Sequence, residues 1–286
     1  MSTTVNGTST QTTPFGREQR AFEGKRVINY TKDGHVAVLE MDDPPANTYT
    51  HEMLRQMDEA ILDARFDRDI EVILVTGKGD KFFSAGANIA MLNSVTPDFK
   101  YMFCLHANET LSRFEQTPKL VIAALNGHCV GGGLEIAMAC DIRIARQDGG
   151  KIGLPEVALG VLPGTGGTQR LARLVGKSRA IELMATGRTF SFEQALEWGM
   201  INDIYEGDGA SFREQALTYA KQFCSPNKAP MAVGHIKRAV QTGIELPLQD
   251  ALALERELQS LLFKSDDAKE GIAAYNEKRM ARFKNS

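Results

Sequence analysis

The chain has 286 residues, of which 43% are hydrophobic and 24% charged, and its formal net charge at pH 7 is -3. A chain of this length buries roughly 75% of its unfolded surface, which predicts one main domain with a smaller helical appendage. The charge balance gives no indication of a nucleic-acid or anionic membrane partner, and we expect neither. No apolar stretch approaches the about 18 residues that a membrane-spanning helix needs.

The four cysteines lie far apart in the sequence, at Cys104, Cys129, Cys140 and Cys224, and none belongs to a CxxC pair. This spacing indicates neither a disulfide framework nor a zinc site. We therefore expect no metal and a reducing, cytoplasmic location. The N-terminal residues are rich in Ser and Thr and lack both the apolar run of a secretory signal and the early arginines of a mitochondrial presequence. A disordered tail is predicted over residues 1–22.

The first regular elements alternate between strand and helix. Residues 35–41 alternate in part between polar and apolar side chains, which predicts a strand, and a Pro-rich turn ends them. Thr50 then offers an N-cap for a helix, because apolar residues recur at helical spacing over 53–61. Residues 71–76 form a short apolar run that is typical of a buried parallel strand.

The same order continues further along the chain. We expect a helix over residues 99–114, a second buried strand over 120–125 and an alternating strand over 141–145. Strands and helices joined by short connections predict an α/β fold with a largely parallel sheet. From residue 190 onward the pattern is mostly helical, with helices expected over 248–263 and 266–283. The leucines of this region indicate either a subunit interface or burial within the chain.

Two glutamates stand in stretches that are otherwise apolar or rich in glycine. Glu135 follows three glycines at the start of an uncharged helical segment, and Glu156 follows Leu154 and Pro155. Burial raises the pKa of a carboxyl, and two carboxyls at one apolar site can exchange protons with a substrate near neutral pH. Taken alone, Glu135 is equally explained as a charge that complements a helix N-terminus.

Two glycine-bearing turns, at residues 84–88 and 131–133, each follow a predicted strand. Small residues leave the backbone N–H groups open, and the first amides of a helix have no intrahelical acceptor. Two such amides that converge on one carbonyl oxygen form an oxyanion hole, which contributes about 3–4 kcal/mol per donor. The glycines are also explained by tight packing. The glycine run at 164–169 lacks the third glycine of a dinucleotide fingerprint, so it predicts no nucleotide cofactor.

Three segments, residues 83–88, 126–142 and 154–171, closely resemble the crotonase, or enoyl-CoA hydratase/isomerase, superfamily. The likeness extends from about residue 34 to the C-terminus. This resemblance implies a crotonase-like fold of repeated ββα units with a C-terminal helical region. It also implies an α/β core with the active site over residues 23–205 and a helical trimerisation region over 206–286.

The resemblance further implies a coenzyme A thioester as substrate, so that coenzyme A belongs to the substrate and no separate cofactor is expected. The backbone N–H groups of Ala85 and Gly132 would hold the thioester oxygen. Gly86, Ala87 and Asn88 are expected to contact the substrate beside them, although many members of the superfamily have aspartate where this chain has Asn88.

Members that resemble hydratases carry acids at both glutamate positions, which implies addition of water across the 2,3 double bond of an enoyl-CoA. Glu135 would deprotonate the water that attacks C3, Glu156 would deliver a proton to C2, and the backbone N–H of Gly164 would help to hold the water. The adenine is expected near the turn that contains Ala46. Basic residues of the last predicted helix are candidates for the phosphates, or else form a solvated basic face: Lys278, Arg279, Arg282 and Lys284.

The resemblance implies a homotrimer or a dimer of trimers. Two alternatives to a hydratase of linear substrates remain: an enoyl-CoA isomerase or hydratase of a cyclic or branched acyl-CoA, and a non-catalytic scaffold that binds CoA esters. The shape of the acyl pocket decides the first of these, and we expect Met91, Leu92 and residues near 161–162 to line it.

Overall fold

The structure is a computed structural model that describes residues 25–286, and the tail predicted over residues 1–22 lies outside the described residues. Two sheets form the framework. The larger has six strands in the order β1-β2-β3-β5-β7-β10, and the smaller has four in the order β4-β6-β8-β9. The strands are β1 (Ile28–Asp33), β2 (Val36–Met41), β3 (Val72–Gly77), β4 (Phe82–Ser84), β5 (Leu120–Leu125), β6 (His128–Val130), β7 (Ile142–Arg146), β8 (Lys151–Gly153), β9 (Phe190–Ser191) and β10 (Asp203–Tyr205).

Most neighbouring strands are parallel, and the exceptions are the antiparallel pairs β1–β2 and β8–β9. Strands β3 and β5 are buried along their whole length, as expected for continuous apolar runs at the centre of a parallel sheet. The predicted α/β class with a largely parallel sheet is confirmed.

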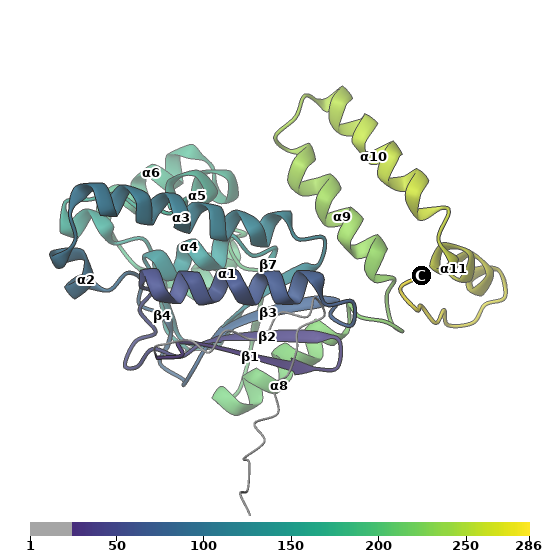
Figure 1. Cartoon of the computed structure of the whole chain (residues 1–286), viewed down its shortest axis with the longest axis horizontal. Helices are drawn as coiled ribbons and strands as arrows, with labels where there is room; N and C mark the ends of the chain where they lie inside the picture. The colour runs from purple at the N-terminus through teal and green to yellow at the C-terminus, as the bar shows by residue number, and fades with distance from the viewer. Residues whose placement is uncertain (1–24) are drawn as a thin grey trace, which may run out of the picture.

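Helices lie on both faces of the larger sheet, with α1 and α3 on one side and α8 on the other (Figure 1). Their bounds are α1 (His51–Phe66), α2 (Ile89–Ser94), α3 (Pro97–Gln116), α4 (Gly132–Met138), the 3-10 helix η1 (Glu156–Leu159), α5 (Gly167–Val175), α6 (Lys177–Thr186), α7 (Phe192–Glu197), α8 (Gly209–Lys221), α9 (Pro230–Gly243), α10 (Leu248–Leu262) and α11 (Asp266–Asn276). The side chain of Thr50 accepts a hydrogen bond from the backbone N–H of Met53, so the predicted N-cap of α1 is confirmed. Among residues 25–286, no helix combines the length and the apolar character needed to cross a bilayer.

The helices α9, α10 and α11 project away from the two sheets (Figure 1). An ion pair anchors this arm to the core, since Lys237 of α9 lies 2.8 Å from a carboxylate oxygen of Asp141, and both side chains are almost fully buried. The Lys237 ammonium also donates to the carbonyl oxygens of Phe114 and Lys119 at 2.6 and 3.0 Å. These bonds satisfy three donors of a charge that would otherwise be costly to bury.

The prediction that one helix covers residues 266–283 is wrong. The helix α11 ends at Asn276, and Lys278 has a positive φ of 55°. The chain then turns back, because the backbone N–H groups of Lys284 and Asn285 donate to the Asp267 carboxylate at 2.7 and 2.9 Å. The basic residues proposed for the phosphates therefore lie beyond the last helix.

Candidate active site

The smaller sheet brings the two glycine-bearing turns together. Strand β4 runs parallel to β6 with Ser84 opposite Cys129, and each strand is followed directly by one of the turns. A Cβ at Gly86, which has a φ of 86°, would lie 2.9 Å from the backbone nitrogen of Gly132. The two turns are therefore in contact at a distance that only glycine allows.

The prediction that Ala85 supplies an oxyanion donor is wrong. Its backbone N–H donates to the carbonyl oxygen of Ala46 at 2.9 Å. A donor that is already paired with a backbone acceptor cannot receive a thioester oxygen without losing that bond. The carbonyl oxygen of Ala46, in the turn where the adenine was expected, therefore binds the backbone of the glycine-bearing turn at residues 84–88.

The next open donor in this turn is the N–H of Ala87. Tyr49 pairs with the turn on both sides, because its N–H donates to the Gly86 carbonyl at 3.0 Å and its carbonyl accepts from the Asn88 N–H at 3.2 Å. The N–H of Ala87 has no acceptor among residues 25–286. The same holds for the N–H of Gly132, the first residue of α4. Two unpaired amides thus lie on adjoining segments.

Glu135 is a buried carboxylate held by three donors. The backbone N–H groups of Thr165 and Gly167 both donate to its Oε1 at 2.8 Å, and the Thr165 hydroxyl donates to its Oε2. The residue is 1% exposed. Hydrogen bonds from three donors stabilise a charged carboxylate and offset the cost of burying it.

Glu156 has the opposite environment. Burial, with a smaller contribution from the nearby charge of Glu135, raises the pKa of its carboxyl to about 7. Its Oε2 is buried and has no hydrogen-bond partner among the described residues. Its Oε1 would lie 3.3 Å from a Cβ at Gly131, the residue that precedes α4. The two acids are therefore neighbours in different environments, since three donors bind the Glu135 carboxylate whereas the Glu156 carboxyl is buried with a pKa raised to about 7.

The other predicted contact residues have clear positions. The side chain of Asn88 caps α2 by accepting from the Met91 N–H at 2.9 Å, and its amide nitrogen donates to the Thr48 hydroxyl at 3.4 Å. The Asn88 side chain therefore fixes the turn. The backbone N–H of Gly164, next to the Thr165 that binds Glu135, has no acceptor among residues 25–286. It remains open to a water molecule.

Sequence reasoning missed two residues at this site, Tyr49 and Thr165. Tyr49 is 4% exposed, and a Cβ at Gly132 would lie 1.6 Å from its Cε1 atom. Its ring therefore covers the first turn of α4. Thr165 lies in a glycine-rich loop, and only its contact with Glu135 shows its part in the site. Neither residue belongs to a local pattern that indicates chemistry.

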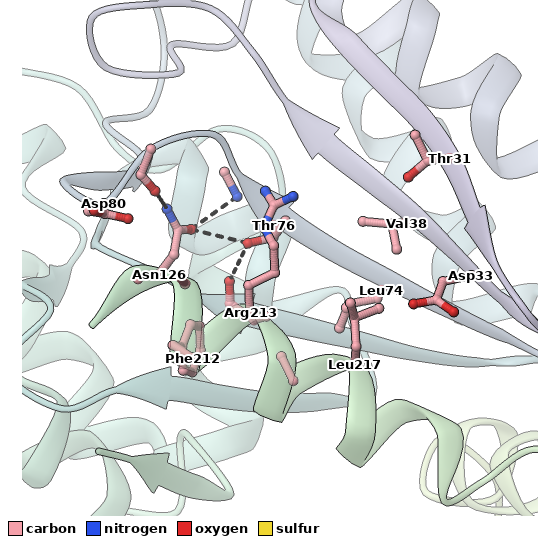
Figure 2. A pocket seen from close by; sticks show the side chains of 16 residues that line it. Thr31, Asp33, Val38, Leu74, Thr76, Asp80, Asn126, Phe212, Arg213 and Leu217 are labelled. Atoms are coloured by element: carbon pink, nitrogen blue, oxygen red, sulfur yellow. Dashed lines mark hydrogen bonds between the residues drawn. The ribbon is translucent and has the colours of Figure 1, made fainter. Parts of the chain in front are cut away.

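A separate cavity of about 460 Å³ lies between α8 and the opposite face of the larger sheet (Figure 2). Neither glutamate lines it. Two of its polar side chains bond to carbonyl groups that also line it, since the Thr76 hydroxyl donates to the Ala124 carbonyl at 3.0 Å and the Asn126 amide donates to the Gly79 carbonyl at 2.7 Å (Figure 2). In residues 25–286, no cluster of three or more His, Cys, Asp or Glu side chains could hold a metal ion.

The chain is similar to known proteins over most of its length. A family model described as enoyl-CoA hydratase/isomerase matches residues 31–286. The short-chain-enoyl-CoA hydratase of Clostridium acetobutylicum is 37% identical over 251 residues, which are 87% of this chain and 94% of that protein. The crotonyl-CoA hydratase of Syntrophomonas wolfei is 35% identical over 255 residues, or 88% of this chain and 95% of that protein. A crystal structure of an enoyl-CoA hydratase from Geobacillus kaustophilus has a TM-score of 0.88 and 46% identity, and the match covers 92% of this chain and 98% of that one.

Proposed function

The chain belongs to the enoyl-CoA hydratase/isomerase family, and we propose that it is an enoyl-CoA hydratase, a hydro-lyase that converts an enoyl-CoA thioester into a 3-hydroxyacyl-CoA. One observation carries this proposal. A carboxylate with three donors, Glu135, lies beside a carboxyl whose pKa is raised to about 7, Glu156, at two turns with unpaired amides. Hydration needs a base for water and an acid for carbon, and this pair supplies both.

The thioester oxygen is held by the N–H groups of Ala87 and Gly132, which stabilise the negative charge that develops there when water adds at C3. By precedent each donor contributes about 3–4 kcal/mol to the transition state. The unpaired Gly164 N–H holds the water, and Glu135 takes its proton as the oxygen–C3 bond forms. Glu156 gives its proton to C2. One hydrogen of the water stays on the new hydroxyl at C3 and the other is on Glu135, so that transfer of this proton from Glu135 to Glu156 through solvent returns both acids to their starting states.

The test is the loss of absorbance of crotonyl-CoA on addition of the purified protein. We expect hydration, with 3-hydroxybutyryl-CoA as the product, and chain-length dependence among straight-chain enoyl-CoA substrates. The protein would instead be an isomerase if it shifts the double bond of a 3-enoyl-CoA and hydrates no linear, cyclic or branched enoyl-CoA. Tight binding of CoA esters without turnover would instead identify a non-catalytic scaffold.

We also propose a homotrimer or a dimer of trimers. The supporting observation is the apolar surface of the projecting arm, where Ile236 and Val240 of α9 are 62% and 60% exposed and lie one helical turn apart. Exposed apolar side chains at this spacing indicate a protein interface. Sedimentation equilibrium should give three or six chains, and Val240→Glu should reduce that number. A wild-type monomer at micromolar concentration would contradict the assembly.

A cytoplasmic location is likewise a proposal. All four cysteines are free, and three of them are buried, which is the usual state of thiols in a reducing compartment. Fractionation of cells that express the tagged protein tests the location.

A further inference from the structure

Arg170 of α5 forms a forked ion pair with Glu115 in the last turn of α3. Its Nε and Nη2 atoms donate to the two carboxylate oxygens of Glu115 at 2.7 and 2.8 Å. The two side chains are only 15% and 18% exposed. The end of α3 is itself held, because the Lys237 ammonium donates to the carbonyl oxygen of the preceding residue, Phe114. Since a bidentate pair fixes the plane of a guanidinium, Arg170 has a defined position between the two helices.

The third nitrogen of this guanidinium binds the loop that precedes α5. The Nη1 atom of Arg170 donates to the carbonyl oxygen of Thr165 at 3.2 Å. It also lies directly against Gly166, because a Cβ at this residue would be 2.0 Å from Nη1. Gly166 has a φ of 104°, which glycine adopts without strain. The loop therefore passes the guanidinium at a distance that only glycine allows.

The N–H groups of the same loop serve the active site. Those of Thr165 and Gly167 donate to Oε1 of Glu135 at 2.8 Å, and that of Gly164 has no acceptor among residues 25–286. A Cβ at Gly167 would lie 2.9 Å from the same Oε1 atom, so the loop and the carboxyl group are in close contact. The loop is thus bound through its N–H groups by Glu135 and through a carbonyl group by Arg170.

We propose that Arg170 and Glu115 are positioning residues for the hydration reaction. The forked pair holds the loop at residues 164–167, so that its amides keep the Glu135 carboxyl and the attacking water in place. Neither residue touches the substrate in this scheme, and both act through the loop. The inference rests on the proposed function, because the loop serves the base and the water of that reaction.

The first test is Arg170→Met, which removes the donor to the loop carbonyl. This variant should lower kcat for crotonyl-CoA about 10- to 100-fold, because a displacement of about 1 Å near the reacting groups can cost about 100-fold in rate. KM should change less than about threefold, since the amides of Ala87 and Gly132, on other turns, hold the thioester. Wild-type kcat in Arg170→Met would overturn the proposal.

The matched control is Arg173→Met, on the same helix. Arg173 also forms a forked pair, with Glu245 at 2.6 and 3.2 Å, and it also donates to a backbone carbonyl, that of Gln169 at 3.2 Å. This pair is about half exposed, and its carbonyl partner lies outside the loop at 164–167. The control should keep kcat within about twofold of wild type. An equal loss of kcat in the two variants would contradict a specific role for Arg170.

A double variant separates positioning from a loss of stability. Arg170→Met leaves the Glu115 carboxylate largely buried without its partner, which should lower the melting temperature. Adding Glu115→Gln removes that charge and should restore most of the melting temperature, whereas kcat should stay low because the Thr165 carbonyl still lacks its donor. Recovery of kcat together with the melting temperature would show a merely structural role and overturn the proposal. If Arg170→Met does not fold, kcat of the double variant decides.

Hydrogen exchange tests the hold on the loop without reference to activity. In peptides that span residues 162–168, the amides of Thr165 and Gly167 should exchange about 10- to 100-fold faster in the double variant than in wild type, the range for loss of a hydrogen bond to a charged group. Unchanged exchange would overturn the proposal. Hydration of crotonyl-CoA by the wild-type protein tests the proposed function separately. Faster exchange in a protein without this reaction would refute the function but not the hold on the loop.

Discussion

We expect the kcat/KM of hydration to fall above about pH 7, because the reaction needs the protonated form of Glu156. Its pKa is raised from an ordinary value of 4.5 to about 7, first because the carboxyl is desolvated and then because Glu135 lies nearby. In the proposed mechanism the protonated form of Glu156 supplies the hydrogen for C2. With a pKa of about 7, about half of the molecules carry this proton at pH 7, about one tenth at pH 8 and about one hundredth at pH 9.

The assay is the initial rate of crotonyl-CoA hydration from pH 5.5 to 9.5 at substrate concentrations below KM, because kcat/KM reports the free enzyme. We expect kcat/KM to fall about tenfold per pH unit above pH 7. Glu156→Gln should lower turnover by at least about 100-fold, since an amide cannot donate a proton to carbon, and the residual rate should lose the alkaline limb. A flat profile up to pH 9, or near wild-type turnover in the variant, would refute the assignment.

The raised pKa of Glu156 should also make the folded protein less stable as the pH rises. A carboxyl whose folded pKa is raised contributes most to stability below its unfolded pKa, here 4.5, and this contribution is lost as the pH rises through about 7. The ionised form is the costly one, because its Oε2 has no partner. Glu156→Gln should therefore melt at a higher temperature than wild type at pH 8, and the difference should shrink toward pH 5.

Three further changes test the site and its anchor. Glu135→Gln should lower the crotonyl-CoA hydration rate at least about 100-fold, and a near wild-type rate would contradict its role as base. Gly86→Ala should abolish hydration, because the new Cβ would meet backbone atoms at 2.9 and 3.0 Å. The control is Gly79→Ala, which has a similar φ of 81° but no atom within 4 Å of the new Cβ, and this variant should stay active. Equal losses of activity in the two variants would contradict the argument. Lys237→Met should lower the free energy of unfolding, measured in urea, by about 3–5 kcal/mol, because the Asp141 carboxylate stays buried without its partner. Adding Asp141→Asn to this variant should recover part of the lost stability. A double variant that is no more stable than Lys237→Met would count against the ion pair.

Much of the fold could be predicted because its signals are local. The continuous apolar runs of β3 and β5, and the Thr50 cap with the apolar spacing of α1, each lie within one element. The short strands of the smaller sheet were missed, since two or three residues carry no periodicity. The end of α11 was also missed, because the Asp267 carboxylate that captures the returning chain is set by tertiary contacts.

The error at Ala85 has a similar cause. A glycine-bearing turn offers several N–H groups, and local sequence does not tell which of them is free. That choice is made by the pairing with residues 46–49, about 40 positions earlier in the chain, which takes the Ala85 N–H and leaves that of Ala87. Residue types alone could therefore predict an oxyanion hole at this turn but not its donor.

The different environments of the two acids come from the same kind of long-range contact. Both glutamates stand in apolar surroundings in the sequence, so burial alone predicts the same shift for each. The loop that follows η1 breaks this symmetry, because it directs two N–H groups and one hydroxyl at Glu135 and none at Glu156. The donors stabilise one charge and the lack of donors disfavours the other. The proposed direction of proton flow, from water to Glu135 and from Glu156 to carbon, follows from where Thr165 and Gly167 lie.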